Sequence, residues 1–441
     1  MTERQRIWPW LLVWGLLDLL CALFCEIHAD EAYYRLYGQF LNWGYFDHPP
    51  MVGLMTALSA AIVPNTSLIL KNLSVRLATV LMHMATVYII WETIPQLSIS
   101  NHQSPVAKFI LLSASIPMFC AYGFITTPDA PLLFFAAMFY FSYRRHLSTP
   151  DPLTTNPLTP NTLLLGISMA GMMYSKYMAV LVIAFAVIGN WRLLRDKRAW
   201  VAVGIAAVLM LPHLWWQYAN DFPSFTYHLV ARATPYSPLY TLEFIPNQWA
   251  VFNPLVWMLM LLLGMRTILR GDAYHRSLGV TIIGFQVFFL LMSFRGHVEP
   301  HWTMVTSIPA IILLMEEETT WKPGLTITFG VLAGLLLVAR IVLMLNILPS
   351  QTGLAGKQQQ MEQIHAEAKG LPVVFDGSFQ TPSLYRFYYN DEAVLVRNMY
   401  DRYTQYDLLH LERDMLGKPA CVRRLGKVYI TDHLTEEDLH E

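Results

Sequence analysis

Charged residues stand in short segments directly beside long apolar runs of this sequence. The segment "HADEAYY" follows the first apolar run and supplies Asp30 and Glu31. Soon after it, "GYFDHPP" supplies Asp47 and His48. Carboxylate and imidazole groups are among the side chains that most often transfer protons in enzymes. Ionisable groups so close to lipid are costly, and they usually mark a functional site.

Three later segments carry charge in the same setting. Any one charge at a membrane edge is typical of a solvated loop, whereas several loops that bring charge to the same face indicate a site. Together with Arg35, these segments contribute Asp129 in "TTPDAP", Lys176 in "YSKY", and Arg295, His297, Glu299 and His301 in "RGHVEPHW".

Prolines stiffen the backbone beside these acids. Pro49 and Pro50 directly follow His48, and Pro128 directly precedes Asp129. Because proline fixes φ and stops helices, the neighbouring side chains are held in a defined geometry. Asp129 also suits the N-terminal cap of the helix that follows, and this structural role is compatible with a functional one.

The composition is that of a membrane protein. Of the 441 residues, 55% are hydrophobic and 14% are charged, and the mean hydropathy is +0.38. In soluble domains, charged residues make up about a quarter of the chain. The net charge of −1 shows no excess of basic residues of the kind that nucleic-acid-binding proteins carry. The four cysteines form neither a CxxC motif nor a disulfide framework. The first apolar run lacks a following cleavage site, which favours a retained helix over a signal peptide.

Repeated apolar runs of membrane-crossing length predict a polytopic α-helical fold. The run 51–63 is short for a crossing and suits a re-entrant or interfacial helix. Two other short runs predict a hairpin around Lys176. We predict eleven spans, at 7–25, 71–94, 105–122, 130–143, 162–175, 178–191, 199–216, 248–267, 277–294, 302–315 and 324–345.

Lysine and arginine set the predicted orientation. With the N-terminus inside, the inner loops hold most of these residues, as in 192–198, and the outer loops hold few. Cytoplasmic loops of membrane proteins carry such an excess. The segments that contain the candidate site residues then all face outside. An odd number of spans places the C-terminal tail outside as well.

Residues 348–441 differ from the rest and predict a small extracytoplasmic α/β domain behind a membrane domain of residues 1–347. The stretches "LPVVFDGS", "EAVLVRN", "PACVRRL" and "KVYITD" have the pattern of short strands. "TPSLYRFYY" and "DRYTQYDLLHLERDML" predict helices that begin at a capping Thr or Asp, and "QTGLAGKQQQMEQIHAEAK" predicts a connecting helix. The Pro/Thr-rich stretch 149–161 predicts a flexible cytoplasmic loop.

The charged segments resemble those of one known family. "DEAYYRLYGQFLNWGYFDHPPMVGLM", "TTPDAPLLFF", "YSKYMAVLV" and "RGHVEPHW" are similar, in order and spacing, to bacterial members of the dolichyl-phosphate-mannose protein mannosyltransferase superfamily. This family 39-like group of GT-C glycosyltransferases also contains the aminoarabinose transferases that act on lipid A. The tail resembles the periplasmic domain of such enzymes. His48 stands where the aminoarabinose transferases have Lys before the proline, which argues against that particular donor.

The resemblance implies an enzyme of the bacterial inner membrane. Such an enzyme moves a sugar, with inversion, from a polyprenyl-phosphate donor to a lipid, glycan or protein acceptor on the outer face. By the same resemblance Asp30 is the base that takes the acceptor's proton. Glu31 and Asp129 are further candidate catalytic groups, with Glu31 either orienting the acceptor or supporting the loop. Neither a metal nor another cofactor is expected, because no pair of ligand residues has metal-motif spacing. Substrate binding is expected of Arg35, Asp47, His48, Lys176, Arg295, His297, Glu299 and His301, with the cations on the departing phosphate.

These residues also have structural interpretations. Asp30 and Glu31 suit the first turn of an amphipathic interfacial helix. Lys176 suits a lysine that snorkels toward the interface, and His301 suits an interfacial belt.

Two other functions would share this membrane topology. A transporter or flippase of lipid-linked sugars commonly shows paired repeats and charges at the midplane of the bilayer. No internal repeat is visible in the sequence. An acyltransferase or a polymerase-like ligase that uses the same lipid carrier is the other alternative. Ionisable residues that lie in or beside the spans keep the transport alternative open, namely Asp18, Arg76, His83, Glu92 and Arg340.

Overall fold

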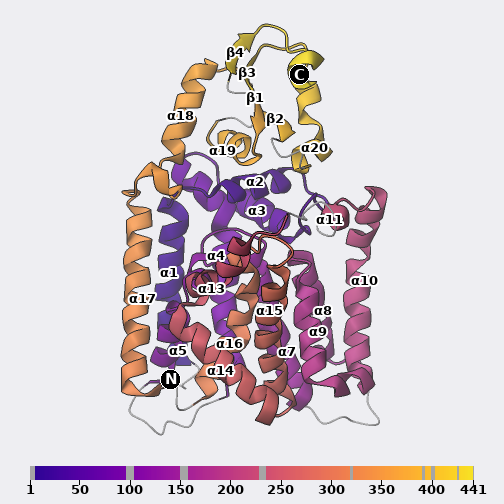
Figure 1. The fold of residues 1–441 in the computed structure, drawn as a ribbon, viewed down its shortest axis with the longest axis vertical. Coiled ribbons are helices and arrows are strands. Elements are labelled where there is room, and N and C mark those ends of the chain that lie inside the picture. Colours follow the sequence, from indigo (N-terminus) through magenta and orange to yellow (C-terminus); the bar gives the residue numbers. More distant parts are fainter. Residues whose placement is uncertain are drawn as a thin grey trace.

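The molecule is a helical bundle with a small mixed sheet at one end (Figure 1). Helix α1 starts at the opposite end of the bundle from the sheet, and α10 and α17 lie on the two flanks of the view. The computed structural model describes residues 5–95, 104–148, 157–227, 235–317, 321–389, 393–398, 403–424 and 427–440. Most of the predicted flexible loop, residues 149–156, lies outside this part of the chain.

Within the described residues, five helices are long and apolar enough to cross a membrane. They are α1 (Trp8–Phe24, after the 3₁₀ turn η1, Gln5–Ile7), α4 (Leu68–Thr93), α10 (Lys197–Ala219), α15 (Ala273–Met292) and α17 (Pro323–Met344). Other predicted spans are shorter or more polar helices, namely α7 (Asp129–Ser148), α8 (Pro160–Ser175), α9 (Ala179–Gly189) and α16 (Ser307–Glu316, after η4, Pro300–Thr306). The number of eleven crossings stays a prediction.

The predicted span 105–122 is wrong as a continuous helix. It consists of α5 (Pro105–Ala114) and the short α6 (Pro117–Ala121). Ile116 is extended, with φ −92° and ψ 109°, because Pro117 follows it and disfavours helical geometry at the preceding residue.

The predicted span 248–267 is also broken. Helices α13 (Phe244–Phe252) and α14 (Pro254–Arg270) meet at a bend of 100°. Asn253 forms the corner, with φ 61° and ψ 155°. Its side chain accepts from the backbone N–H of Val256 at 2.9 Å and donates to the carbonyl of Ser115 at 2.7 Å. If this bent pair makes one crossing, the described residues hold six candidate spans.

Two short helices lie between α1 and α4. They are α2 (Ala29–Gln39) and α3 (Met51–Ile62). The 12 residues of α3 extend about 18 Å, which is too short for a bilayer core of about 30 Å. Helix α3 packs against α2 and α4 instead, and α2 lies directly beneath the sheet region (Figure 1). The remaining short helices of this part are η2 (Trp191–Arg195), α11 (Pro223–Thr226) and α12 (Pro238–Leu242).

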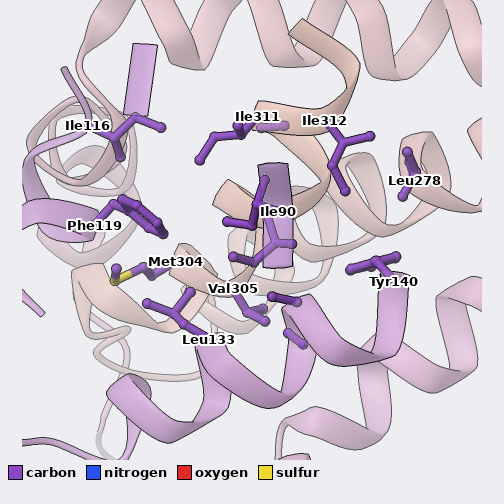
Figure 2. Close-up of a cluster of buried hydrophobic side chains, with 14 of the residues drawn as sticks. Ile90, Ile116, Phe119, Leu133, Tyr140, Leu278, Met304, Val305, Ile311 and Ile312 are labelled. Atoms are coloured by element: carbon purple, nitrogen blue, oxygen red, sulfur yellow. The ribbon is translucent and has the colours of Figure 1, made fainter. Parts of the chain in front are cut away.

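A dense apolar cluster fills the middle of the bundle (Figure 2). Ile90 of α4, Phe119 of α6, Leu278 of α15 and Ile311 of α16 are fully buried in it. Because lipid is as apolar as these side chains, close packing rather than exclusion of water holds the helices together.

The chain ends in an α/β segment, residues 357–440. Its helices are α18 (Lys357–Ala368), α19 (Gln380–Tyr388), α20 (Gln405–Leu409), η7 (Leu411–Met415) and α21 (Glu436–His440), and η6 (Ser350–Thr352) precedes them. Its strands are β1 (Val373–Gly377), β2 (Ala393–Asn398), β3 (Ala420–Arg424) and β4 (Lys427–Thr431), in the order β2-β1-β3-β4. β1 pairs in parallel with β2 and β3, and β4 is antiparallel to β3.

The predicted strands of this α/β segment are confirmed, and one predicted helix is not. The stretch 401–416 breaks into α20 and η7 at His410, whose φ of 50° cannot continue a helix. The segment also shares a core with the membrane part, because Ile27 and Val75 belong to the same buried cluster as Val373 and Phe387.

Candidate active site

Helix α2 begins at the acidic motif and fixes the direction of its two carboxylates. His28 caps the helix, with its ring accepting from the backbone N–H of Asp30 at 3.3 Å. Glu31 closes the capping box by accepting from the backbone N–H of His28 at 2.9 Å. The Asp30 side chain is 36% exposed, whereas that of Glu31 is fully buried. The two neighbouring acids therefore face different surroundings.

Glu31 is enclosed by donors from three segments. Arg76 of α4 donates to it twice, at 2.8 and 2.6 Å, and the backbone N–H of Thr126 donates at 2.8 Å. Arg76 also donates to the carbonyls of Cys25 and Glu26, at 2.8 and 2.9 Å. Of the two predicted roles of Glu31, contact with the acceptor or support of the loop, this geometry favours support.

Asp129 and Lys176 form a buried ion pair. Asp129 is the first residue of α7, and Lys176 ends α8 in an extended conformation. The ammonium lies 2.8 and 2.9 Å from the two carboxylate oxygens, and the side chains are 7% and 3% exposed for Lys176 and Asp129. Lys176 therefore does not snorkel away from the protein. The ring of His301 lies 3.7 Å from the same carboxylate.

The turn "GYFDHPP" is fastened to α2 by tyrosines. Tyr37 donates its hydroxyl hydrogen bond to Asp47, and the hydroxyl of Tyr34 lies 3.2 Å from the ring of His48. The backbone N–H of Tyr45 donates to the carbonyl of His48 at 3.1 Å, which closes the turn. Both Asp47 and His48 are thus held in place, as the neighbouring prolines predicted.

Three of the acids converge on one phenol. Burial, and after it the negative charges of Asp30, Asp47 and Asp129, raise the pKa of the Tyr34 hydroxyl well above its ordinary value. These carboxylates come from three separate segments of the chain, so their fields overlap in one place. That these acids act together in one site stays a prediction.

Other predicted site residues lie less centrally. Arg35 is half-buried on α2, and Arg295 is exposed. His297 is exposed, 3.7 Å from Glu299, and its ring packs on that of Tyr240 at 5.5 Å. Of the segment "RGHVEPHW", His301 is the member that the geometry brings to Asp129.

A polar network that the sequence analysis missed connects the Lys176 turn to the Asp47 turn. The hydroxyl of Tyr177 lies 3.1 Å from Nε2 of His213, and it accepts a hydrogen bond from the side-chain amide of Gln217 at 2.9 Å; both partners are on α10. His213 in turn lies 2.7 Å from the carbonyl of Trp43, and Ser224 donates to the carbonyl of Tyr45 at 2.8 Å. His213 and Gln217 sit inside an apolar run without any motif around them, so the sequence gives no local signal for their role.

Three of the ionisable residues inside the spans, Asp18, His83 and Arg340, pair with one another. Asp18 lies 2.7 Å from His83 and accepts from Arg340 at 2.8 Å, which joins α1, α4 and α17. Arg76 forms an ion pair with Glu31, as described above. In the described part of the chain, no group of three His, Cys, Asp or Glu side chains is arranged to hold a metal ion.

Comparisons with known proteins find similarity to glycosyltransferases. Residues 47–216 match the family model described as dolichyl-phosphate-mannose-protein mannosyltransferase. The lipid A galacturonosyltransferase RgtD of Rhizobium johnstonii is 24% identical over 78% of this chain and 73% of its own length.

Solved structures share the fold. ArnT from Cupriavidus metallidurans in the apo state superposes with a TM-score of 0.63 at 13% identity, over 94% of this chain and 92% of that chain. The same protein bound to undecaprenyl phosphate superposes with a TM-score of 0.61 at 15% identity and the same coverage. The transporter alternative finds no support among these matches. The chain is a multi-pass membrane glycosyltransferase with the GT-C fold that it shares with ArnT, and its residues 47–216 are similar to the dolichyl-phosphate-mannose-protein mannosyltransferase family.

Proposed function

We propose that this enzyme transfers a sugar from a polyprenyl phosphate to a lipid-anchored glycan, with inversion, on the outer face of the inner membrane. The donor assignment rests on the fold shared with ArnT, which was solved with undecaprenyl phosphate. The acceptor assignment rests on RgtD, which acts on lipid A. A protein acceptor is the alternative, because the family model that matches residues 47–216 is described as a protein mannosyltransferase.

The outer-face assignment is supported by the distribution of charge. Arg192 and Arg195 lie in η2, directly before α10, and Arg198 lies in the first turn of α10. In Figure 1 that end of α10 lies far from α2 and the sheet. Because cytoplasmic loops carry the excess of arginine and lysine, α2 and the α/β segment belong on the periplasmic side. The division of the chain into domains near residue 347 stays a prediction.

The exposure of Asp30 is the observation that carries the mechanism. Its side chain is 36% exposed, whereas the side chains of Glu31 and Asp129 are 0% and 3% exposed. A base must reach the hydroxyl whose proton it takes. In the proposed step Asp30 accepts the acceptor's proton, the hydroxyl oxygen bonds to the anomeric carbon, and the bond from that carbon to the phosphate oxygen breaks. The polyprenyl phosphate departs with the electron pair.

Lys176 is the proposed partner of the departing phosphate. An ammonium has three donor hydrogens, and Asp129 holds the group in one position. Cations aimed at the developing charge stabilise the transition state without reorganising. Asp47 and His48, fixed by Tyr37 and Tyr34, are the proposed sugar-binding groups.

Transfer in a reconstituted system tests the proposal. Purified protein in nanodiscs would receive lipid A and a panel of undecaprenyl-phosphate sugars that includes galacturonate. We expect release of undecaprenyl phosphate together with a lipid A product whose mass is increased by one sugar. Asp30→Asn is the control, because it keeps the shape of the side chain and removes its basicity. Absence of transfer with every donor would overturn the proposal.

A further inference from the structure

The C-terminal α/β segment touches both acidic motifs through one residue. Gln405 is the first residue of α20, and its side-chain carbonyl accepts from the backbone N–H of Phe46 at 2.9 Å. Its own backbone N–H donates to the hydroxyl of Tyr33 at 2.7 Å. Phe46 directly precedes Asp47, and Tyr33 lies on the first turns of α2 after Asp30. Gln405 therefore links the two segments that carry the proposed base and the proposed sugar-binding acid.

This junction is enclosed. Gln405 is 5% exposed and Tyr33 is 1% exposed. The ring of Tyr33 packs on Phe379 at 4.4 Å and on Tyr37 at 5.0 Å. Buried hydrogen bonds hold geometry strictly, because a group that loses its partner there pays for its desolvation.

A second glutamine reaches the base itself. Gln380, the first residue of α19, donates from its side-chain amide to the carboxylate of Asp30 at 3.1 Å. Helix α19 packs on α2, which places the exposed side chain of Gln380 beside Asp30. A neutral amide donor orients a carboxylate without neutralising it, which leaves the carboxylate able to accept a proton.

We propose that Gln405 and Gln380 are positioning residues of the transferase site, so that the C-terminal segment completes that site. The inference rests on the proposed roles of Asp30 and Asp47. Gln405 sets the Asp47 turn and therefore affects use of the donor. Gln380 sets the Asp30 carboxylate and therefore affects the rate of transfer. If the C-terminal segment only covered the site, substitutions at Gln405 and Gln380 would not change donor use and transfer rate separately.

Substitutions at Gln405 test the first link. Gln405→Met removes the acceptor at similar volume, whereas Gln405→Glu keeps an acceptor oxygen in either protonation state. In single-turnover transfer we expect Gln405→Met to raise the donor concentration for half-maximal rate roughly three- to tenfold, as loss of one hydrogen bond implies. The maximal rate should change little, and Gln405→Glu should recover most of the loss.

Substitutions at Gln380 test the second link. Gln380→Ala should lower the maximal rate by roughly three- to tenfold with little change in donor dependence. Gln380→Glu places a second carboxylate beside Asp30 and should raise the pKa of that base. The acidic limb of the rate profile should therefore move to higher pH. Gln359→Met on the exposed face of α18 is the matched control and should match the wild type.

Hydrogen exchange separates this inference from the proposed function. In Gln405→Met the amide of Phe46 should exchange faster than in the wild type or in Gln405→Glu, whether or not transfer is detected. An inactive wild type with this exchange pattern would refute the proposed function and leave the link between the segments standing. An active wild type with equal exchange and equal donor dependence in both Gln405 variants would overturn the inference.

Discussion

Removal of the Lys176 ammonium should destabilise the protein through the carboxylate that it leaves behind. The two groups are 2.8 and 2.9 Å apart and almost without solvent. Lys176→Met keeps an unbranched side chain of similar length but carries no charge. Asp129 is then a buried anion with its cation removed, and the nearby ring of His301 at 3.7 Å is a weaker substitute.

The magnitude follows from the geometry. At an effective dielectric constant of 20, two unit charges at this separation attract by about 6 kcal/mol. The cost of removing both charges from water offsets much of that gain in the intact pair. Loss of one partner alone typically costs about 3–5 kcal/mol, whereas replacing both costs much less. We therefore expect Lys176→Met to be much less stable than the double variant Lys176→Met/Asp129→Asn.

Thermal unfolding of purified protein, measured together with single-turnover transfer, is the assay. The double variant should regain most of the Tm that the single variant loses, but it should not regain transfer, because the phosphate still lacks its cation. Arg266→Met is the control, because its partner Glu317 forms an exposed pair worth about 0–1 kcal/mol. A double variant that regains both stability and activity would refute the phosphate role of Lys176, and a fully stable single variant would refute the stranded-charge argument.

Three further predictions concern the acidic motif and the topology. Asp30→Asn should slow single-turnover transfer about 10²- to 10⁴-fold at unchanged Tm. If this variant transfers at a near-normal rate while Asp47→Asn is inactive, Asp47 is the base and Asp30 is not. Glu31→Gln should lower Tm strongly, because Arg76 is 1% exposed and would keep its charge without a carboxylate; an unchanged Tm would show that the carbonyl acceptors of Arg76 suffice. A cysteine placed beside Glu441 should react with a membrane-impermeant thiol reagent from the periplasm and one at Arg195 should not, and the reverse pattern would invalidate the outer-face assignment.

Local signals in the sequence account for much of the fold. Apolar runs predicted where helices form, and short segments with the pattern of strands predicted β1 to β4. The corners at Pro117 and Asn253 escaped prediction, because an apolar run looks continuous even where one residue turns the chain. The hydropathy of a segment carries no information about its backbone dihedral angles.

The sequence named several of the charged groups that the structure pairs, but it did not predict their partners or the polar network around His213 and Gln217. The motifs named Asp30, Asp129 and Lys176, but no spacing rule connects Asp129 with a lysine 47 residues later. The same holds for Glu31 and Arg76, which are 45 residues apart. Such contacts arise from the packing of one helix against another. Sequence periodicity predicts which face of a helix is buried, but not which helix packs against that face.

The pairing of Asp18 with Arg340 has a consequence for how the protein is made. The two residues are 322 positions apart, so translation at about 5–20 residues per second leaves Asp18 without Arg340 for roughly 15–60 s. An aspartate in the middle of an inserted helix costs about 3 kcal/mol at the translocon. His83, only 65 positions later, is the first partner to emerge, and it can keep α1 beside α4 while the rest is synthesised. Arrival of α17 then closes the bundle from its outer flank, which makes the last membrane helix a checkpoint for completed assembly.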